Sequence, residues 1–183
     1  VLINAQGDKT VRRMTSITKE TKSDGDMSVI TFLWPADVKG TRMLTHTHKK
    51  RDDDQWLFMP SLKRVKRISS RNKSGAFMGS EFSYEDLGSQ EVEKFTHKFL
   101  KDVTLDGREC WLMERVPVSK KSGYSKQTQW VDKEYRQPLK IEYYDRKGEL
   151  LKVAVFKNYK KKEKRWRVHE IKMDNVQTRK SSI

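Results

Sequence analysis

Two histidines offer the most obvious chemistry in this sequence. His46 and His48 are two residues apart, so both side chains lie on one face of an extended strand, and the acidic run Asp52–Asp54 follows closely. Imidazole and carboxylate groups at such spacing can bind zinc. The third ligand would have to come from His97, His169 or a carboxylate, and the sequence specifies none of them. Exposed strand histidines are the simpler interpretation, and we expect neither a metal nor another cofactor.

Motifs for covalent catalysis and nucleotide binding do not occur. The sequence has no Gly-x-Ser-x-Gly elbow, no Walker loop and no Cys-x-x-Cys pair. Its single cysteine, Cys110, excludes an internal disulfide and has no neighbour that would activate it as a nucleophile. Glu81, Glu85 and Asp86 form an acidic stretch without a predicted histidine partner. We therefore expect that the protein is not an enzyme.

Positive charge is the strongest feature of the composition. The 183 residues include 40 Lys and Arg against 25 Asp and Glu, a formal net charge of +15. Such a charge favours nucleic acid, phospholipid headgroups or an acidic protein face as partners, although a solvated surface is the simpler explanation. The densest basic runs are residues 63–67 and 157–167. No run of about 18 apolar residues is present, so no segment is predicted to span a membrane.

The elements that position these groups are strands, because apolar and polar residues alternate along most of the chain. Asp-Gly and Lys-Gly turns at short spacing indicate antiparallel hairpins. The pattern predicts about eleven strands and one short helix within residues 82–92. The predicted strands are residues 11–21, 27–34, 40–50, 54–59, 63–69, 94–105, 108–116, 125–133, 138–145, 149–159 and 164–173.

The alternation also predicts a dry face that is rich in aromatic side chains. Aromatic and methionine side chains can line a cavity for an apolar ligand. An ordinary packed core is the alternative for each of these residues. The predicted wall consists of Phe32, Trp34, Trp56, Phe58, Phe99, Trp111, Met113, Trp130 and Tyr143.

Residues Ser74–Leu87, the covering segment, interrupt the alternation with large apolar side chains and two glycines. A sheet this wide needs a cover over its apolar face, and little predicted helix is available to provide it. We therefore expect the segment to act as a movable lid, with Phe77, Met78 and Phe82 pointing into a concave face. The lid residues are Gly75, Phe77, Met78, Gly79, Phe82 and Tyr84.

Five long stretches occur in order along the chain: FLWPADVKGTRMLTH, DDDQWLFMPSLKRVKRISS, NKSGAFMGSEFSYEDL, GRECWLMERVP and YSKQTQWVDKEYRQPLKIEYYD. Together they resemble the LolA-like family of bacterial outer membrane lipoprotein-sorting proteins. The resemblance covers residues from about 11 to 173 and does not depend on one short pattern.

The resemblance implies a mainly β (α+β) fold, a strongly curved antiparallel half-barrel with short helices or a loop over its concave face. It also implies a periplasmic protein with a signal peptide, whose hydrophobic cavity carries acyl chains of lipids or lipoproteins toward the outer membrane. An inner-membrane lipid-exporting transporter or an outer-membrane acceptor would be its partner. Residues 1–183 are expected to form one domain and a monomer, with the family's N-terminal helix and C-terminal end absent from this chain.

Two other classes of function compete with the carrier. A β-domain without a ligand, used for structure or protein contact, is one of them. Single-strand nucleic acid binding is the other, but the alternation places Trp166 opposite Arg165 and Arg167, and a stacking platform needs aromatic rings and charges together. We therefore expect no nucleic acid partner. The basic residues expected to contact headgroups or a partner are Lys63, Arg64, Lys66 and Arg67.

Overall fold

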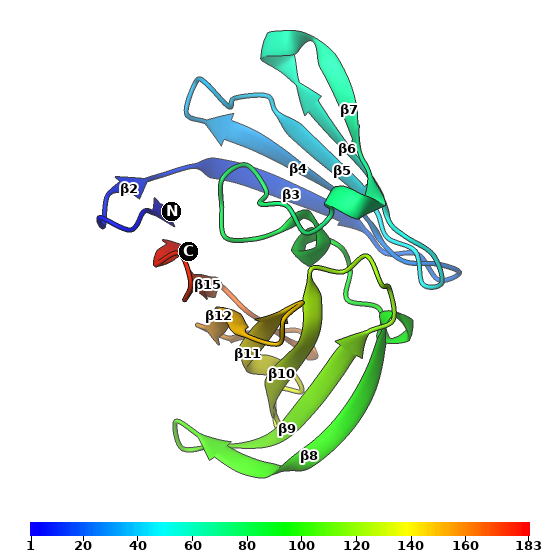
Figure 1. The fold of residues 1–183 in the computed structure, drawn as a ribbon, viewed down its shortest axis with the longest axis vertical. Coiled ribbons are helices and arrows are strands. Elements are labelled where there is room, and N and C mark those ends of the chain that lie inside the picture. The colour runs from blue at the N-terminus through cyan, green and yellow to red at the C-terminus, as the bar shows by residue number, and fades with distance from the viewer. The chain divides into compact units, whose positions relative to one another are not determined.

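The computed structural model describes residues 1–183 and shows a mainly β chain whose strands pair in antiparallel ladders (Figure 1). The chain divides into two compact units. The first unit consists of Val1–Leu2, Lys9–Lys94 and Ser119–Ser122. The second unit consists of Ile3–Asp8, Phe95–Val118 and Gly123–Ile183. None of the helices is long and apolar enough to cross a membrane.

The first unit is built on a five-stranded meander in which each strand pairs with the next along the chain. Short connections between successive strands make this the simplest topology. The strands, in sheet order, are β3 (Arg13–Lys19), β4 (Met27–Trp34), β5 (Arg42–His46), β6 (Asp54–Met59) and β7 (Arg64–Ile68). Figure 1 shows the five strands side by side, in blue to green-cyan.

Gly25 allows the turn between β3 and β4 to approach the chain that follows β5. A β-carbon at this position would lie 2.5 Å from the carbonyl oxygen of Thr47, which is well inside contact distance. The N–H of Thr47 donates to the carbonyl oxygen of Asp26 at 2.9 Å, which ties the same two segments together. A larger residue at position 25 would therefore separate the two turns at this end of the sheet.

The covering segment packs on one face of the meander and completes its core. Phe77, from the middle of the segment, is only 4% exposed and belongs to the same buried cluster as residues of β4, β5, β6 and β7. Met78, Tyr84 and Leu87 pack against this cluster as partly buried neighbours. The cluster consists of Phe32, Val38, Met43, Leu57, Ile68 and Phe77.

Backbone hydrogen bonds close the covering segment into a compact loop. The N–H of Phe77 donates to the carbonyl oxygen of Phe82 at 2.7 Å, and the N–H of Tyr84 donates to that of Gly75 at 3.1 Å. The loop therefore satisfies much of its own backbone instead of joining the sheet, as buried backbone groups require.

Short 3-10 helices replace the helix expected within residues 82–92. The turn η3 (Tyr84–Leu87) is capped by Ser83, whose N–H donates to the Asp86 carboxylate at 2.7 Å in a capping box. The turn η4 (Val92–Lys94) follows it. Two further turns, η1 and η2, are Pro60–Leu62 and Ser70–Asn72.

The larger sheet of the chain has nine strands in the order β2-β1-β16-β15-β12-β11-β10-β9-β8. Its long strands form a meander, and β8 and β9 make a long curved hairpin (Figure 1). The long strands are β8 (Phe95–Leu105), β9 (Arg108–Pro117), β10 (Tyr124–Asp132), β11 (Pro138–Asp145), β12 (Leu150–Lys157) and β15 (Glu170–Asn175). The short ones are β1 (Leu2–Ile3), β2 (Lys9–Thr10) and β16 (Lys180–Ser182). A separate ribbon pairs β13 (Lys160–Lys162) with β14 (Arg165–Arg167).

The buried face of the nine-stranded sheet is identified by its cross-strand register. Ile141, Ala154 and Met173 lie directly opposite one another on β11, β12 and β15, and all three are at most 4% exposed. Tyr124 and Tyr143 extend this core, with ring centroids 5.0 Å apart. Aromatic pairs at this separation add to the stability that area burial provides.

The strands agree well with the expected ranges, but their grouping into sheets does not. The expectation of one continuous sheet is wrong, because the meander of the first unit and the nine-stranded sheet are separate. The structure also has sixteen strands, because residues 149–173 hold four strands and the terminal segments add β1, β2 and β16. Strands of two or three residues carry no detectable alternation.

Phe77→Ala should lower the free energy of unfolding by about 3–5 kcal/mol, because it removes a ring from a packed core. Chemical denaturation measures this loss. Phe82→Ala, at a half-buried position in the same segment, serves as the control and should cost less. A loss below about 1 kcal/mol for Phe77→Ala would show that the segment detaches readily and is not part of the core.

Candidate functional site

Three consecutive carboxylates, the acidic turn Asp52–Asp54, lead from the β5–β6 connection into β6. They form ion pairs with basic side chains from distant parts of the first unit. Asp52 Oδ1 lies 3.8 Å from Nζ of Lys73, which immediately precedes the covering segment. Asp53 Oδ1 lies 2.5 Å from Nζ of Lys94, which follows the segment and ends η4. Both ion pairs are largely shielded from water. The acidic turn therefore holds the covering segment at both ends.

Close backbone contacts fix the end of the covering segment as well. The N–H of Ser89 donates to Oγ1 of Thr47 at 2.9 Å. A β-carbon at Gly88 would lie 2.7 Å from Oδ2 of Asp53. The chain can pass this close to the acidic turn only because residue 88 has no side chain.

Hydrogen bonds from basic side chains keep the acidic turn ionised. Bonds from Arg67 at 2.5 Å and Arg51 at 2.9 Å lower the pKa of Asp54 to about 2. Burial opposes ionisation of Asp52, but the hydrogen bond from Lys121 at 2.6 Å and the nearby charges outweigh it and lower its pKa. Asp52 and Asp54 are therefore fixed negative charges at neutral pH.

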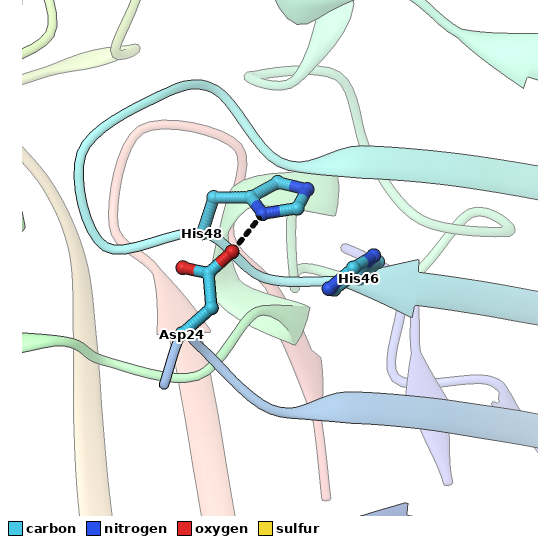
Figure 2. A group of neighbouring side chains, drawn as sticks. All are labelled: Asp24, His46 and His48. Atoms are coloured by element: carbon cyan, nitrogen blue, oxygen red, sulfur yellow. Dashed lines mark hydrogen bonds and ion pairs between the residues drawn. The ribbon is translucent and has the colours of Figure 1, made fainter. Parts of the chain in front are cut away.

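Asp24, His46 and His48 form a second polar cluster (Figure 2). Nδ1 of His48 lies 2.6 Å from Oδ2 of Asp24, and Nε2 of His48 lies 3.2 Å from Oδ2 of Asp54. The rings of His46 and His48 are 4.1 Å apart between centroids. This cluster contains the two histidines that the sequence singled out, and it adds an aspartate that the sequence did not.

The covering residues are placed for packing more than for movement. Phe77 lies 5.8 Å from the Phe32 ring and makes an edge contact with Tyr84 at 5.7 Å, measured between centroids. Met78 and Gly79 form the tip of the loop with left-handed φ values of 50° and 75°. The Met78 carbonyl oxygen accepts a hydrogen bond from the Arg12 guanidinium.

The other two residues expected in the lid play smaller parts. Phe82 is half-buried, and its main contribution is the carbonyl that closes the loop. Gly75 lacks a positive φ, so its backbone conformation, unlike that of Gly79, is one that other residues also adopt. Phe77 is therefore part of the packed core and not a free anchor.

The wall residues of the first unit do not share one face, which corrects the expectation. Phe32 is buried and Trp34 is half exposed. On β6 it is Leu57 that enters the core with Phe32, so Trp56 and Phe58 lie on the opposite face of the sheet.

Three wall residues of the second unit do share a face. Phe99 lies directly opposite Met113, and Met113 lies opposite Gln129, in a row that continues to buried Ile141. Trp111 is two residues from Met113 on the same strand and therefore points to the same side. Phe99 is 52% exposed, so the row, which is apolar except for Gln129, begins at the core and ends at an exposed side chain.

Tyr143 belongs to the buried face, but Trp130 does not. Tyr143 is 6% exposed, and Nζ of buried Lys152 lies 5.5 Å from its ring centroid. Trp130 pairs with Leu112 on the other face, where Nζ of Lys140 lies 4.4 Å from its ring centroid. Trp130 is thus part of a polar surface with a cation–π contact, which corrects its assignment to the wall.

The basic residues expected to meet headgroups fall into two groups. Lys63, Arg64 and Lys66 are exposed along β7 and the turn before it. Arg67 is also exposed, but its guanidinium binds Asp54. Arg67 is thus the one member of this group that is engaged in an ion pair with the acidic turn.

The second unit contains a polar stack that the sequence did not reveal. The guanidinium of Arg108 binds Asp132, which is 1% exposed, and covers the Tyr135 ring at 3.9 Å from Cζ to centroid. Tyr135 in turn packs on Trp166 of β14, at 4.3 Å between centroids. Cys110 is completely buried on this side, and burial raises the pKa of its thiol, so it is not an activated nucleophile.

Comparisons with known proteins find one family model and several similar proteins. A family model described only as an uncharacterized protein matches residues 24–183. The chain is 52% identical to a solved domain from Vibrio parahaemolyticus that is assigned provisionally to an outer membrane lipoprotein-sorting protein. The TM-score is 0.96, and the match covers 98% of this chain and 77% of that one.

Three further proteins are similar to the chain. A DUF1329 family protein from Desulfovibrio piger has 31% identity and a TM-score of 0.89, over 93% of this chain and 73% of that one. A LolA superfamily protein from Nitrosomonas europaea has 19% identity and a TM-score of 0.77, over 98% of this chain and 77% of that one, which shows a shared fold. An uncharacterized protein from Methanocaldococcus jannaschii is 45% identical over 51 residues, which are 28% of this chain and only 15% of that protein.

The ion pairs of the acidic turn predict how stability depends on pH. Because the pKa values of Asp52 and Asp54 are lower in the folded chain than the ordinary value near 3.9, their contribution is fully present above about pH 5. It is lost as the pH falls toward 2. Acid unfolding followed by circular dichroism should therefore show a loss of stability within this range.

Asp54→Asn should lower the thermal midpoint at neutral pH and make the loss of stability below about pH 4 shallower. Asp106→Asn is a matched control, because Asp106 lies exposed in the β8–β9 turn. The Asp106→Asn variant should keep the acid profile of the parent. Identical acid profiles for the parent and Asp54→Asn would contradict the role assigned to this carboxylate.

Proposed function

The chain belongs to the LolA-like family of outer membrane lipoprotein-sorting proteins, and from this premise we propose that it carries acyl chains of lipids or lipoproteins. The proposal includes the assignment of residues 1–183 to one carrying domain. It also includes a periplasmic address, reached with a signal peptide. No catalytic step is required, since a carrier needs only to bind its cargo, shield it and release it.

The observation that carries this proposal is the row of side chains that runs out from the core of the second unit. The row begins at buried Ile141, passes Gln129 and Met113, and ends at Phe99, whose side chain is 52% exposed. Trp111 widens the same face. Large exposed apolar groups that continue a core are characteristic of binding surfaces.

The chemistry of this row suits an acyl chain. Acyl chains offer no directional hydrogen bonds, so affinity comes from buried area at about 0.8 kcal/mol per methylene. The flexible Met113 thioether can adapt to chains of different shape, and the flat rings of Phe99 and Trp111 provide area with few rotatable bonds. Release then requires only an acceptor that buries the acyl chain more completely. The proposed partner is an inner-membrane transporter that supplies the acyl chain or an outer-membrane acceptor that receives it.

The covering segment takes a restricted role in this proposal. Its centre is fixed by Phe77 and its ends by Lys73 and Lys94, so we assign any gating to the tip at Met78 and Gly79. Exposed Lys63, Arg64 and Lys66 remain the residues proposed to meet anionic headgroups or an acidic partner face.

A nucleic acid partner is less consistent with the aromatic side chains of the second unit. Trp166, the one tryptophan within the densest basic run, packs its ring on Tyr135 at 4.3 Å between centroids. Its neighbours on β14, Arg165 and Arg167, point to the other side. A ring held in this way is not offered to a base together with those charges.

Protein purified from its own cell envelope should carry a lipid, visible as added mass in native mass spectrometry and identified after extraction. The emptied protein should take up a fluorescent fatty acid. A lipid-free mass together with no uptake would overturn the carrier proposal. The combined variant Phe99→Gln and Met113→Gln should weaken fatty acid binding about ten-fold, which corresponds to lost contact with about two methylenes.

Leu112→Gln is the matched control for this experiment. Leu112 adjoins Met113 on β9 but points to the opposite face of the sheet. This variant should bind the fatty acid like the parent. Equal losses in both variants would assign the effect to general destabilisation of β9 and not to a binding face.

A further inference from the structure

Asp24, His46 and His48 bring three metal-binding side chains together at the turn end of the five-stranded sheet (Figure 2). Asp24 lies in the turn between β3 and β4, His46 ends β5, and His48 follows two residues later. One ligand atom from each residue lies within 4.8 Å of the other two. The sequence provided the two histidines, and the fold supplies the third ligand from 22 residues upstream of His46.

Hydrogen bonds hold the aspartate in position from several directions. Oδ1 of Asp24 accepts the N–H of Lys49 at 2.9 Å, which leaves Oδ2 directed at His48. Oγ1 of Thr21 donates to the carbonyl oxygens of Asp24 and Gly25 at 2.7 and 2.8 Å. The turn that carries the carboxylate is therefore a defined structure before any ligand binds.

Nε2 of His48 contacts a carboxylate, as the ring nitrogen that does not bind the metal often does in metal-bound histidines. Nε2 of His48 lies 3.2 Å from Oδ2 of Asp54, and Asp54 is itself held by Arg51 and Arg67. A carboxylate behind one ring nitrogen keeps a proton on that nitrogen and directs the lone pair of the other toward the metal. Here the other nitrogen, Nδ1, faces Asp24.

We propose that Asp24, His46 and His48 form a binding site for one Zn²⁺ ion, with a water molecule as fourth ligand. Imidazole nitrogens and a carboxylate are ligands that zinc accepts, whereas Ca²⁺ and Mg²⁺ prefer sites made only of oxygen. Tetrahedral ligands about 2.0–2.1 Å from zinc lie about 3.3 Å from one another. The present separations, from 2.6 Å up to at most 4.8 Å, bracket that value.

Zinc competes with protons at this site, because imidazole nitrogens and carboxylates bind the metal only through atoms that carry no proton. Affinity should therefore fall as the solution becomes more acidic.

The site does not depend on the carrier proposal, and its effect is on the first unit alone. The ion would join the β3–β4 turn to the end of β5, next to the acidic turn that anchors the covering segment. Because a ligand that binds only the folded state raises its stability by mass action, zinc should stabilise this end of the sheet.

Isothermal titration of the untagged, chelator-treated protein with ZnCl₂ tests the proposal. The parent should bind one Zn²⁺ per chain, and its thermal midpoint should rise with zinc concentration. Substituted Co²⁺ should give the strong visible absorption of a four-coordinate site. MgCl₂ and CaCl₂, at equal concentration, should produce no heat of binding and no shift.

His46→Gln should weaken zinc binding at least about ten-fold, and Asp54→Asn, which leaves all three ligands in place but changes the group behind His48, should weaken it about 10–100-fold. His97→Gln, at an exposed strand position, is the matched control and should bind zinc like the parent. Folding of each variant is checked by circular dichroism without metal. Absence of zinc binding by the parent, or equal binding by the parent and a folded His46→Gln variant, would overturn the proposal.

Discussion

The pairing of three adjacent carboxylates with surrounding cations is the interaction on which the first unit depends. Without compensating charges, the carboxylates of the acidic turn Asp52–Asp54 would repel one another and destabilise the turn. Lys73 and Lys94 compensate it from the two sides of the covering segment. The ion pairs that compensate the charge of the acidic turn therefore also hold the covering segment against the sheet.

This arrangement separates rigid from adaptable parts of the molecule. Polar contacts of fixed geometry gather at the turn end of the first unit, where carboxylates, backbone N–H groups and glycines at close approaches leave little freedom. The row of the second unit ends in the apolar side chains of Met113 and Phe99, and Phe99 is open to solvent. A carrier of flexible chains benefits from this division, because the scaffold keeps its shape while the binding surface adjusts.

Strand positions could be read from the sequence, but side-chain facing could be read only in part. Alternation located β9 and β11 almost to the residue. It failed on β6, where Gln55 to Met59 include consecutive apolar residues and either Trp56 or Leu57 could face the core. The choice is made by pairing with β5 and by packing against Phe77, which are contacts distant in sequence. The Trp130–Val131 pair on β10 posed the same ambiguity.

The polar sites were less predictable than the strands for a similar reason. The His-x-His spacing was visible, but Asp24 joins it only because β3 and β4 form a hairpin beside β5. The Arg108–Tyr135–Trp166 stack likewise combines residues from three separate segments. Its members look unremarkable one by one. A local sequence pattern shows whether a segment is a strand, but a site also depends on which strands and turns lie next to each other in the fold.

The position of β7 gives its basic residues a physical task that needs no partner. β7 and β3 are the two outermost strands of the five-stranded sheet, and each leaves a row of backbone groups unpaired on one side. Arg64, Lys66 and Arg67 lie along one edge, and Arg13 and Lys19 lie along the other. Such edges are templates on which a second chain could add a strand, and like charges on both chains oppose that addition. Part of the chain's positive charge thus protects an open β-sheet against aggregation.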